Sequence, residues 1–313
     1  MNKQEHIQII DSGEIDLGKL FGLIWKKKVQ ILAIIFFTGT ISFISSNFLT
    51  VQYQSSAIIV ERNSSGTSPL SEFSGIASIT GINLPSMPSN ISDIAVEKVK
   101  SRAFFKELMT SKGLISNLLA ADGYDPSNGE IIFDRDMFNP DNGKWSLNYF
   151  ASGEPSYLYA HEVYLKNLSI SKDKINGFVT VSYEHVSPEF AYEFVTLIIH
   201  QINESFRIKD KTKSKNSIQY LKNELEKAAN QTVRNSISNL IEAEMEVQMR
   251  ADIYENYLFD FIEEPYIPEK RSWPSKKLIS VIGVLIGIFL SLIFVLVSNF
   301  RLRSKSSAQL DIK

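Results

Sequence analysis

Two long apolar runs lie near the two ends of the chain, and neither contains a charged residue. The first is Val29–Leu49 and the second is Leu278–Asn299. Each spans about 20 residues, and a helix of that length, rising about 1.5 Å per residue, crosses a hydrocarbon core of about 30 Å. The pattern predicts transmembrane helices at residues 29–50 and 277–299.

A cleaved signal peptide is the alternative interpretation of the first run, which contains several hydroxyl and amide side chains. The run begins late for a signal peptide, exceeds the usual length of its apolar core and lacks an Ala-x-Ala cleavage site. We therefore prefer a membrane-spanning helix.

Basic residues predict the orientation of the first helix. Lys26–Lys28 precede it, whereas the first basic residue after it is Arg62. Because Lys and Arg accumulate on the cytoplasmic side, the arm at residues 1–28 is predicted to be cytoplasmic. With two spans, the tail at residues 300–313 lies on the same side, and the region between the spans is exported.

Small side chains recur at intervals of four residues in both apolar runs. Small residues with this spacing let membrane helices approach closely, although glycine is also generally frequent in such helices. The residues expected to pack are Gly283, Gly287 and Ser291 in the second run and Thr38, Ser42 and Ser46 in the first.

The exported region begins with mixed strand and helix signals. Val51–Glu61 and Gly177–Glu184 are rich in β-branched and aromatic residues and predict strands, while Tyr157–Leu168 predicts a helix. Residues 122–156 are dense in Gly, Pro, Asn and Asp, which is typical of turns. Residues 51–187 are therefore predicted to form an α/β base, and the fold class is an α+β membrane protein.

From Pro188 to Ile262 the chain contains no glycine and no second proline, which predicts helix over residues 188–263. One continuous helix, on the order of 100 Å long, fits this pattern, and so does a hairpin turning at the polar segment Asn230–Ser236. The hairpin is preferred because the chain has to return to the membrane. The apolar stripes predicted along this region are Ile218, Leu221 and Leu225, followed by Ile237, Ile241, Met245, Met249 and Tyr254.

Residues 264–276 are predicted to form a proline-rich linker between this helical region and the second span. Pro265, Pro268 and Pro274 stop the helix and favour an extended, semi-rigid approach to the bilayer.

The 313-residue sequence shows no motif for catalysis, cofactor binding or metal binding. It has no cysteine, and its net charge of −2 gives no basic excess of the kind typical of nucleic-acid-binding proteins. Gly13–Leu20 approaches the phosphate-binding pattern G-x-x-x-x-G-K-[ST], but Leu20 stands where a hydroxyl is needed. No H-x-H or H-E-x-x-H pattern joins its four histidines, His6, His161, His185 and His200.

The chain resembles the Wzz-type chain-length determinants, the polysaccharide co-polymerases, and four stretches carry the resemblance. The 122–156 stretch departs from the family pattern. The four stretches are Glu14–Lys28 at the entry to the first span, Ser92–Phe105 ending at Gly113 and Leu114, Val179–Tyr183 followed by Ser187–Val195, and the three linker prolines followed by the helix of Gly283 and Gly287.

The resemblance implies an α/β base with long helices projecting into the periplasm and a ring-like homo-oligomer in the bacterial inner membrane, with an octamer as one candidate. It implies no enzymatic activity and no cofactor. The implied partners are other copies of the chain, membrane lipids, the membrane polymerase and the polyprenyl-linked glycan. The implied role is to set the modal length of a surface polysaccharide. The O-antigen of lipopolysaccharide is the first expectation, and enterobacterial common antigen and capsule stay open.

Two other classes of protein compete with length control. A two-span receptor would need an output domain after the second span, and Arg301–Lys313 is too short for one. A transmembrane adaptor for a separate cytoplasmic tyrosine kinase, acting in capsule or exopolysaccharide export, is the closer alternative.

Overall fold

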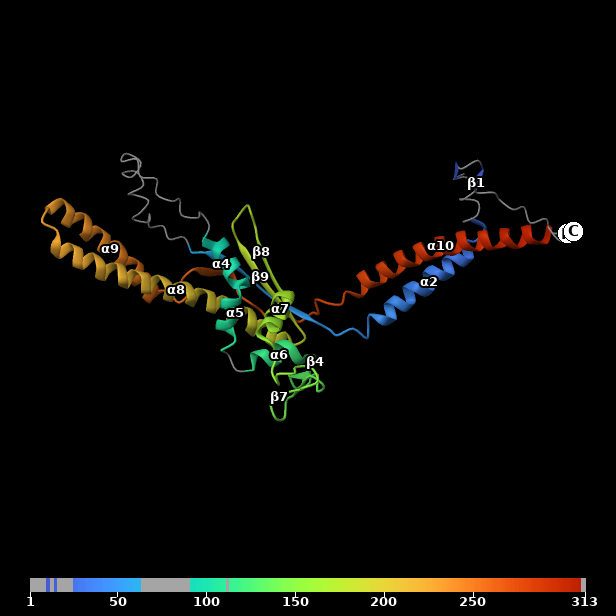
Figure 1. Cartoon of the computed structure of the whole chain (residues 1–313), viewed down its shortest axis with the longest axis horizontal. Helices are drawn as coiled ribbons and strands as arrows, with labels where there is room; N and C mark the ends of the chain where they lie inside the picture. The colour runs from blue at the N-terminus through green and yellow to red at the C-terminus, as the bar shows by residue number, and fades with distance from the viewer. Residues whose placement is uncertain (1–9, 12–13, 16–24, 63–90, 111–112, 311–313) are drawn as a thin grey trace. The chain divides into compact units, whose positions relative to one another are not determined.

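The computed structural model describes residues 10–11, 14–15, 25–62, 91–110 and 113–310. The chain divides into two compact units, one formed by Met1–Thr50 with Trp273–Lys313 and the other by Val51–Ser272. Figure 1 shows the elements of each unit. Most of the arm predicted at residues 1–28 lies outside the described residues.

Two apolar helices pack against each other in the first unit (Figure 1). Helix α2 spans Lys28–Ser45 and helix α10 spans Lys276–Leu310. Both contain stretches long and apolar enough to cross a membrane, with mean hydropathies of 1.7 and 3.0. The short strands β1, Ile10–Asp11, and β2, Glu14–Ile15, form an antiparallel pair in the same unit.

A four-stranded antiparallel sheet forms the base of the second unit, in the order β10-β3-β9-β8. Side chains of β3 alternate between the core and the other face, and Ala57 of β3 aligns with Val181 of β9 in the core. The strands are β3 Tyr53–Glu61, β8 Leu168–Lys172, β9 Val179–His185 and β10 Phe259–Glu263.

Short helices adjoin the sheet, and local capping sets their limits. Ser101 separates two of these helices, because its Oγ accepts a hydrogen bond from the amide of Phe104 and caps a new helix there. Gly113 has a φ of 79°, which starts the next helix with a left-handed residue. The helices are α4 Ile91–Lys100, α5 Arg102–Leu108, α6 Leu114–Ala120 and α7 Tyr157–Asn167.

Two small hairpins occupy the turn-rich segment between α6 and α7. Their turns, Asp125–Gly129 and Asn139–Gly143, follow the same pattern as Asp173–Gly177 between β8 and β9. In each, the first side chain accepts a hydrogen bond from the amide two residues on, at 2.8–2.9 Å, and the closing glycine has a positive φ. The hairpins pair β4 Ala121–Asp125 with β5 Glu130–Phe133 and β6 Phe138–Asn139 with β7 Lys144–Trp145.

The long helical region is a hairpin of α8, Pro188–Lys227, and α9, Gln231–Ile253 (Figure 1). The turn comes earlier than the predicted Asn230–Ser236, because Asn230 caps α9 by accepting the amide of Thr232 at 2.8 Å. The prediction of helix as far as residue 263 is wrong, since β10 extends the sheet from Phe259.

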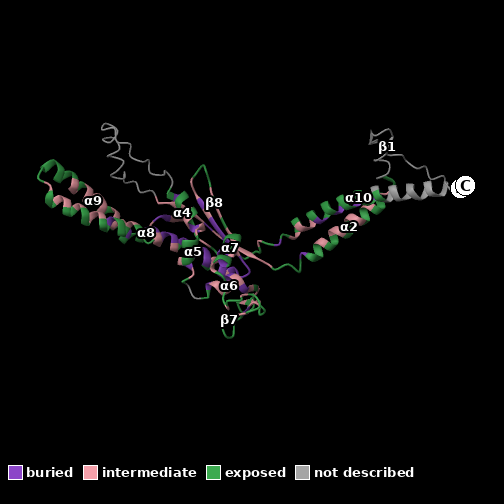
Figure 2. Ribbon diagram, viewed as in Figure 1, coloured by how far each residue is buried: buried purple, intermediate pink, exposed green. Residues whose placement is uncertain are grey.

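The core lies where the first half of α8 crosses the sheet, as the purple ribbon in Figure 2 shows. Phe194, Val195 and Ile198 are at most 1% exposed there. In the part of α8 after Phe206, Ser214 is the one buried residue among those described. The second half of the α8–α9 hairpin therefore has little core of its own.

Candidate functional site

Two glycines of α10 lie against small side chains of α2. A Cβ added at Gly283 would stand 2.4 Å from Ser42 Cβ, and one at Gly287 would stand 2.1 Å from Thr38 Oγ1 and 3.0 Å from Ile35 Cα. Real Cβ atoms do not approach neighbours so closely. Glycine at both positions is thus required for this packing.

Hydrogen bonds join the two helices near their ends. The Oγ of Ser42 donates to the carbonyl of Ile279 at 2.8 Å, and the Nζ of Lys276 donates to Asn47 Oδ1 at 2.5 Å. Ser291 is buried and donates its hydroxyl to the carbonyl of Ile288 in its own helix, and Ser46 is also buried. Of the six residues, Gly283, Gly287, Thr38 and Ser42 lie at the contact between α2 and α10.

The proline-rich segment is tied to the start of β3 within the second unit. Ser55 Oγ donates to the carbonyl of Tyr266 at 2.8 Å, and the amide of Ser272 donates to the carbonyl of Gln52 at 2.8 Å. Pro268 is buried and Pro265 is half-buried, while Pro274 is buried in the first unit. The outgoing chain is thus fixed beside the incoming one.

The predicted stripes of the hairpin divide into two groups. A half-buried group lies in the seam between α8 and α9 and consists of Ile218, Leu221, Leu225, Ile237 and Ile241. Met245 and Met249, 55% and 54% exposed, lie outside the seam with Tyr254. The expectation that all the α9 residues share one face is wrong. A spacing of four residues advances about 40° per step around a helix, so Met249 is rotated by about 120° from Ile237.

Polar contacts close the hairpin at both ends. Arg234 Nη1 donates to the carbonyl of Leu225 at 3.1 Å and so caps the last turn of α8. At the other end Lys211 forms an ion pair with Asp252, and the Tyr257 hydroxyl donates to Asp210 at 2.9 Å.

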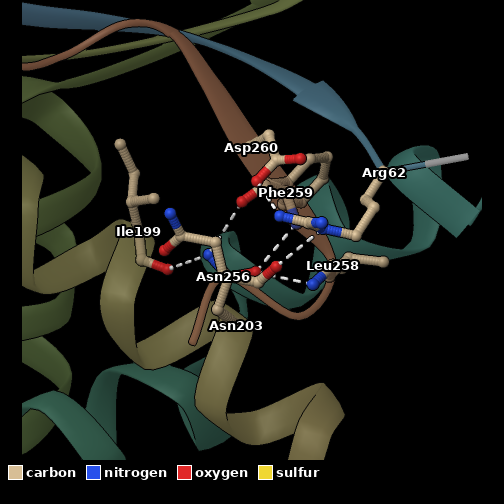
Figure 3. Close-up of polar contacts among 7 residues, drawn as sticks. All are labelled: Arg62, Ile199, Asn203, Asn256, Leu258, Phe259 and Asp260. Atoms are coloured by element: carbon tan, nitrogen blue, oxygen red, sulfur yellow. Dashed lines mark hydrogen bonds and ion pairs between the residues drawn. The ribbon is translucent and has the colours of Figure 1, made fainter. Parts of the chain in front are cut away.

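Asn203 is a buried polar residue that the sequence analysis did not single out (Figure 3). Its Oδ1 accepts hydrogen bonds from the amides of Leu258 and Phe259, at 2.7 and 2.8 Å. Its Nδ2 donates to the carbonyls of Ile199 and Phe259, at 3.1 and 3.3 Å. One side chain thereby fixes the start of β10 to α8. The sequence did contain a signal for this role, because Asn203 is a polar amide on an otherwise apolar face of the predicted helix.

Arg62 holds the same corner from the end of β3 (Figure 3). It forms an ion pair with Asp260 of β10, and its Nε donates to the carbonyl of Asn256 at 3.1 Å. Its guanidinium also lies over the ring of Tyr254, 4.2 Å from the centroid. The chain leaving the hairpin is therefore fixed by both α8 and β3.

Comparison with known families identifies the N-terminal third of the chain. Residues 13–112 match the family model described as Wzz, chain length determinant protein. This stretch is a Wzz domain. It includes α2, β3, α4 and α5, and the resemblance expected from the sequence is confirmed.

Solved structures similar to this Wzz-domain chain are polysaccharide co-polymerases. A full-length bacterial polysaccharide co-polymerase matches 92% of this chain and 99% of its own, at 13% identity and a TM-score of 0.38. A fragment of the co-polymerase WzzB from Salmonella Typhimurium matches 71% of this chain and 100% of its own, at 14% identity and a TM-score of 0.30. A mutant of WzzBSF, the lipopolysaccharide O-antigen chain-length regulator of Shigella flexneri, matches 71% of this chain and 100% of its own, at 11% identity and a TM-score of 0.22. The comparison with curated proteins gives no significant match.

Within the described residues, no group of three or more acidic, histidine or cysteine side chains could hold a metal ion near the Wzz domain or elsewhere. His161 and His185 each contact a backbone carbonyl through Nε2, those of Lys100 and Asn117. Burial lowers the pKa of His185 to about 4, so its imidazole is neutral at pH 7. His185 thus has a structural role that links β9 to α6.

Proposed function

We propose that this protein is a non-enzymatic regulator of surface polysaccharide chain length, acting as an oligomeric scaffold beside a membrane polymerase. The observation that carries the proposal is the Wzz domain at residues 13–112. The substrate proposed first is the O-antigen of lipopolysaccharide, which is also the polymer named for the similar Shigella flexneri regulator.

Placement in the bacterial inner membrane is the first part of this proposal. The apolar stretch of α2, Lys28–Ser45, has no buried residue, and 22% of the most apolar part of α10, within Lys276–Val295, is buried. Large apolar side chains such as Phe36 and Leu285 are 70% and 60% exposed. Exposed apolar surface on both helices, described as far as Val297 in α10, fits a lipid solvent better than water.

Both termini are expected to be cytoplasmic and residues 52–276 periplasmic, because Lys26–Lys28 precede α2. Fusions of a periplasm-active reporter at Gly129 and at Lys313 test this topology. Activity at Gly129 with none at Lys313 is the expected result, and periplasmic activity at Lys313 would contradict it.

Self-association through the helical hairpin is the second part. Met245, Met249 and Ile253 are exposed at four-residue intervals along α9, at 55%, 54% and 65%. Exposed Lys213 and Lys215 on α8 provide charge opposite to that of the acidic residues on α9. Copies arranged in a ring would cover this apolar stripe and place hairpins side by side.

Variants of the hairpin are expected to change product length while leaving total polymer nearly constant. Leu225→Ala and Ile241→Ala each remove a half-buried contact in the seam, at a cost of about 2 kcal/mol, and should broaden the length distribution. Met249→Lys should disrupt assembly without unfolding the hairpin.

The measurement is a gel ladder of surface polysaccharide, with the oligomer sized in detergent in parallel. Asn239→Lys adds the same charge at an exposed polar site on α9 and serves as the control. If Met249→Lys keeps both the wild-type oligomer and the wild-type ladder, the exposed stripe has no part in assembly.

A further inference from the structure

A continuous cluster of aromatic rings is formed by four residues between α6 and α7, in the segment that departs from the Wzz pattern, and by one residue at the start of α7. Phe138, Trp145, Phe150 and Tyr159 contact one another in turn, with ring centroids 4.8, 5.5 and 5.9 Å apart. Tyr149 contacts Phe150, with centroids 6.4 Å apart. These five residues form what we call the ring cluster.

The ring cluster has a buried residue at one end and solvent-exposed tyrosines at the other. Phe138 is buried, and the β6–β7 pairing places it opposite Trp145. Tyr149 and Tyr159 are 53% and 41% exposed, and the neighbouring Leu147 is 70% exposed. Rigid aromatic groups grouped at a surface in this way are typical of binding sites.

The segment that carries four of the five rings is acidic, which restricts what the ring cluster can bind. Residues 121–156 contain seven Asp or Glu and two Lys or Arg, a net charge of −5, while the whole chain carries −2. This field opposes anionic phospholipid headgroups, nucleic acids and acidic polymers. The partner is therefore neutral or cationic, and it must offer both apolar faces and hydrogen-bonding groups.

We propose that the ring cluster binds a glycan without net negative charge, with sugar rings lying against Tyr149 and Tyr159. Sugar C–H groups would contact the aromatic faces, and sugar hydroxyls would donate to Asp136 and Asn148, which are exposed in the same segment of the chain. The proposal rests on the function proposed above, since that function brings a growing polysaccharide to this protein.

Fluorescence of Trp145 tests the proposal, because this tryptophan belongs to the ring cluster. The other two tryptophans, Trp25 and Trp273, have to be replaced so that only Trp145 emits. The full chain carrying Trp25→Phe and Trp273→Phe is placed in nanodiscs. It is titrated with surface polysaccharide of the source strain, released from lipid by mild acid, and separately with polygalacturonate as an acidic polymer.

A saturable change in Trp145 emission is expected with the released polysaccharide and not with polygalacturonate. Tyr149→Ala with Tyr159→Ala should weaken the binding roughly tenfold, since both stacking faces are removed. Tyr220→Ala removes a 65% exposed tyrosine from α8 and should leave the binding unchanged.

Three results would overturn the proposal: no saturable change, equal binding by the Tyr149→Ala, Tyr159→Ala variant, or equal binding of polygalacturonate. Quenching of Trp145 by brominated phospholipids in the nanodisc would also overturn it, by showing that the cluster contacts lipid. Length control is judged separately from the polysaccharide ladder of a deletion strain, so failure of this site leaves that function standing.

Discussion

Asn203→Ala is expected to lower the free energy of unfolding of the second unit by about 4 kcal/mol. The change removes the acceptor of two amides, those of Leu258 and Phe259, and each buried donor left without a partner costs about 1–3 kcal/mol. Thermal unfolding of the purified full chain, followed by circular dichroism, should show a midpoint lower by about 10 °C.

Two further variants separate the hydrogen bonds from the volume of the side chain. Asn216→Ala, at an exposed site on α8, should leave the midpoint unchanged. Asn203→Asp keeps an oxygen for the two amides but loses the donor, so it should have an intermediate effect. If Asn203→Ala unfolds at the same temperature as Asn216→Ala, the corner is not held by this side chain.

Gly283→Leu combined with Gly287→Leu is expected to separate α10 from α2. Overpacking of a close contact costs about 1–3 kcal/mol, and here the Cβ at Gly287 would meet the backbone of Ile35 at 3.0 Å. Because the chain contains no cysteine, a cysteine pair at Gly39 and Val284 reports the contact directly. A Cβ at Gly39 would lie 3.3 Å from Val284 Cγ2.

Disulfide formation by that pair should be efficient in the otherwise wild-type chain and fall to background in the double leucine variant. Leu285→Phe adds bulk at a site 60% exposed on α10, and crosslinking should persist there. If crosslinking persists in the double leucine variant, the two glycines are not needed for the contact between α2 and α10.

Sequence pattern was sufficient to predict the elements that are apolar over their whole length. The two uncharged runs correspond to α2 and α10, and the β-branched Val179–Tyr183 run lies in the central strand β9. The hairpin was one of two alternatives. The structure contains the hairpin, and Asn230 and Arg234 stabilise it by capping the two helix ends at the turn.

Other elements depend on contacts distant in sequence. The short strand β10 follows a long helix without a glycine or proline between them, and it is fixed by Asn203 and Arg62 from two other elements. The exposed position of Met245 and Met249 depends on which turns of α9 face α8. A period of 4.0 residues in the sequence does not match the 3.6 residues per turn of a helix.

The protein is proposed to regulate polysaccharide length and not to make the polymer. The most direct measurement is a gel ladder of surface polysaccharide from a strain lacking this chain, with total polymer quantified alongside. We expect total polymer to stay near the wild-type amount while the modal band gives way to a broad distribution. Restoring the wild-type chain should bring back the modal band. Complete loss of polymer on deletion would contradict it.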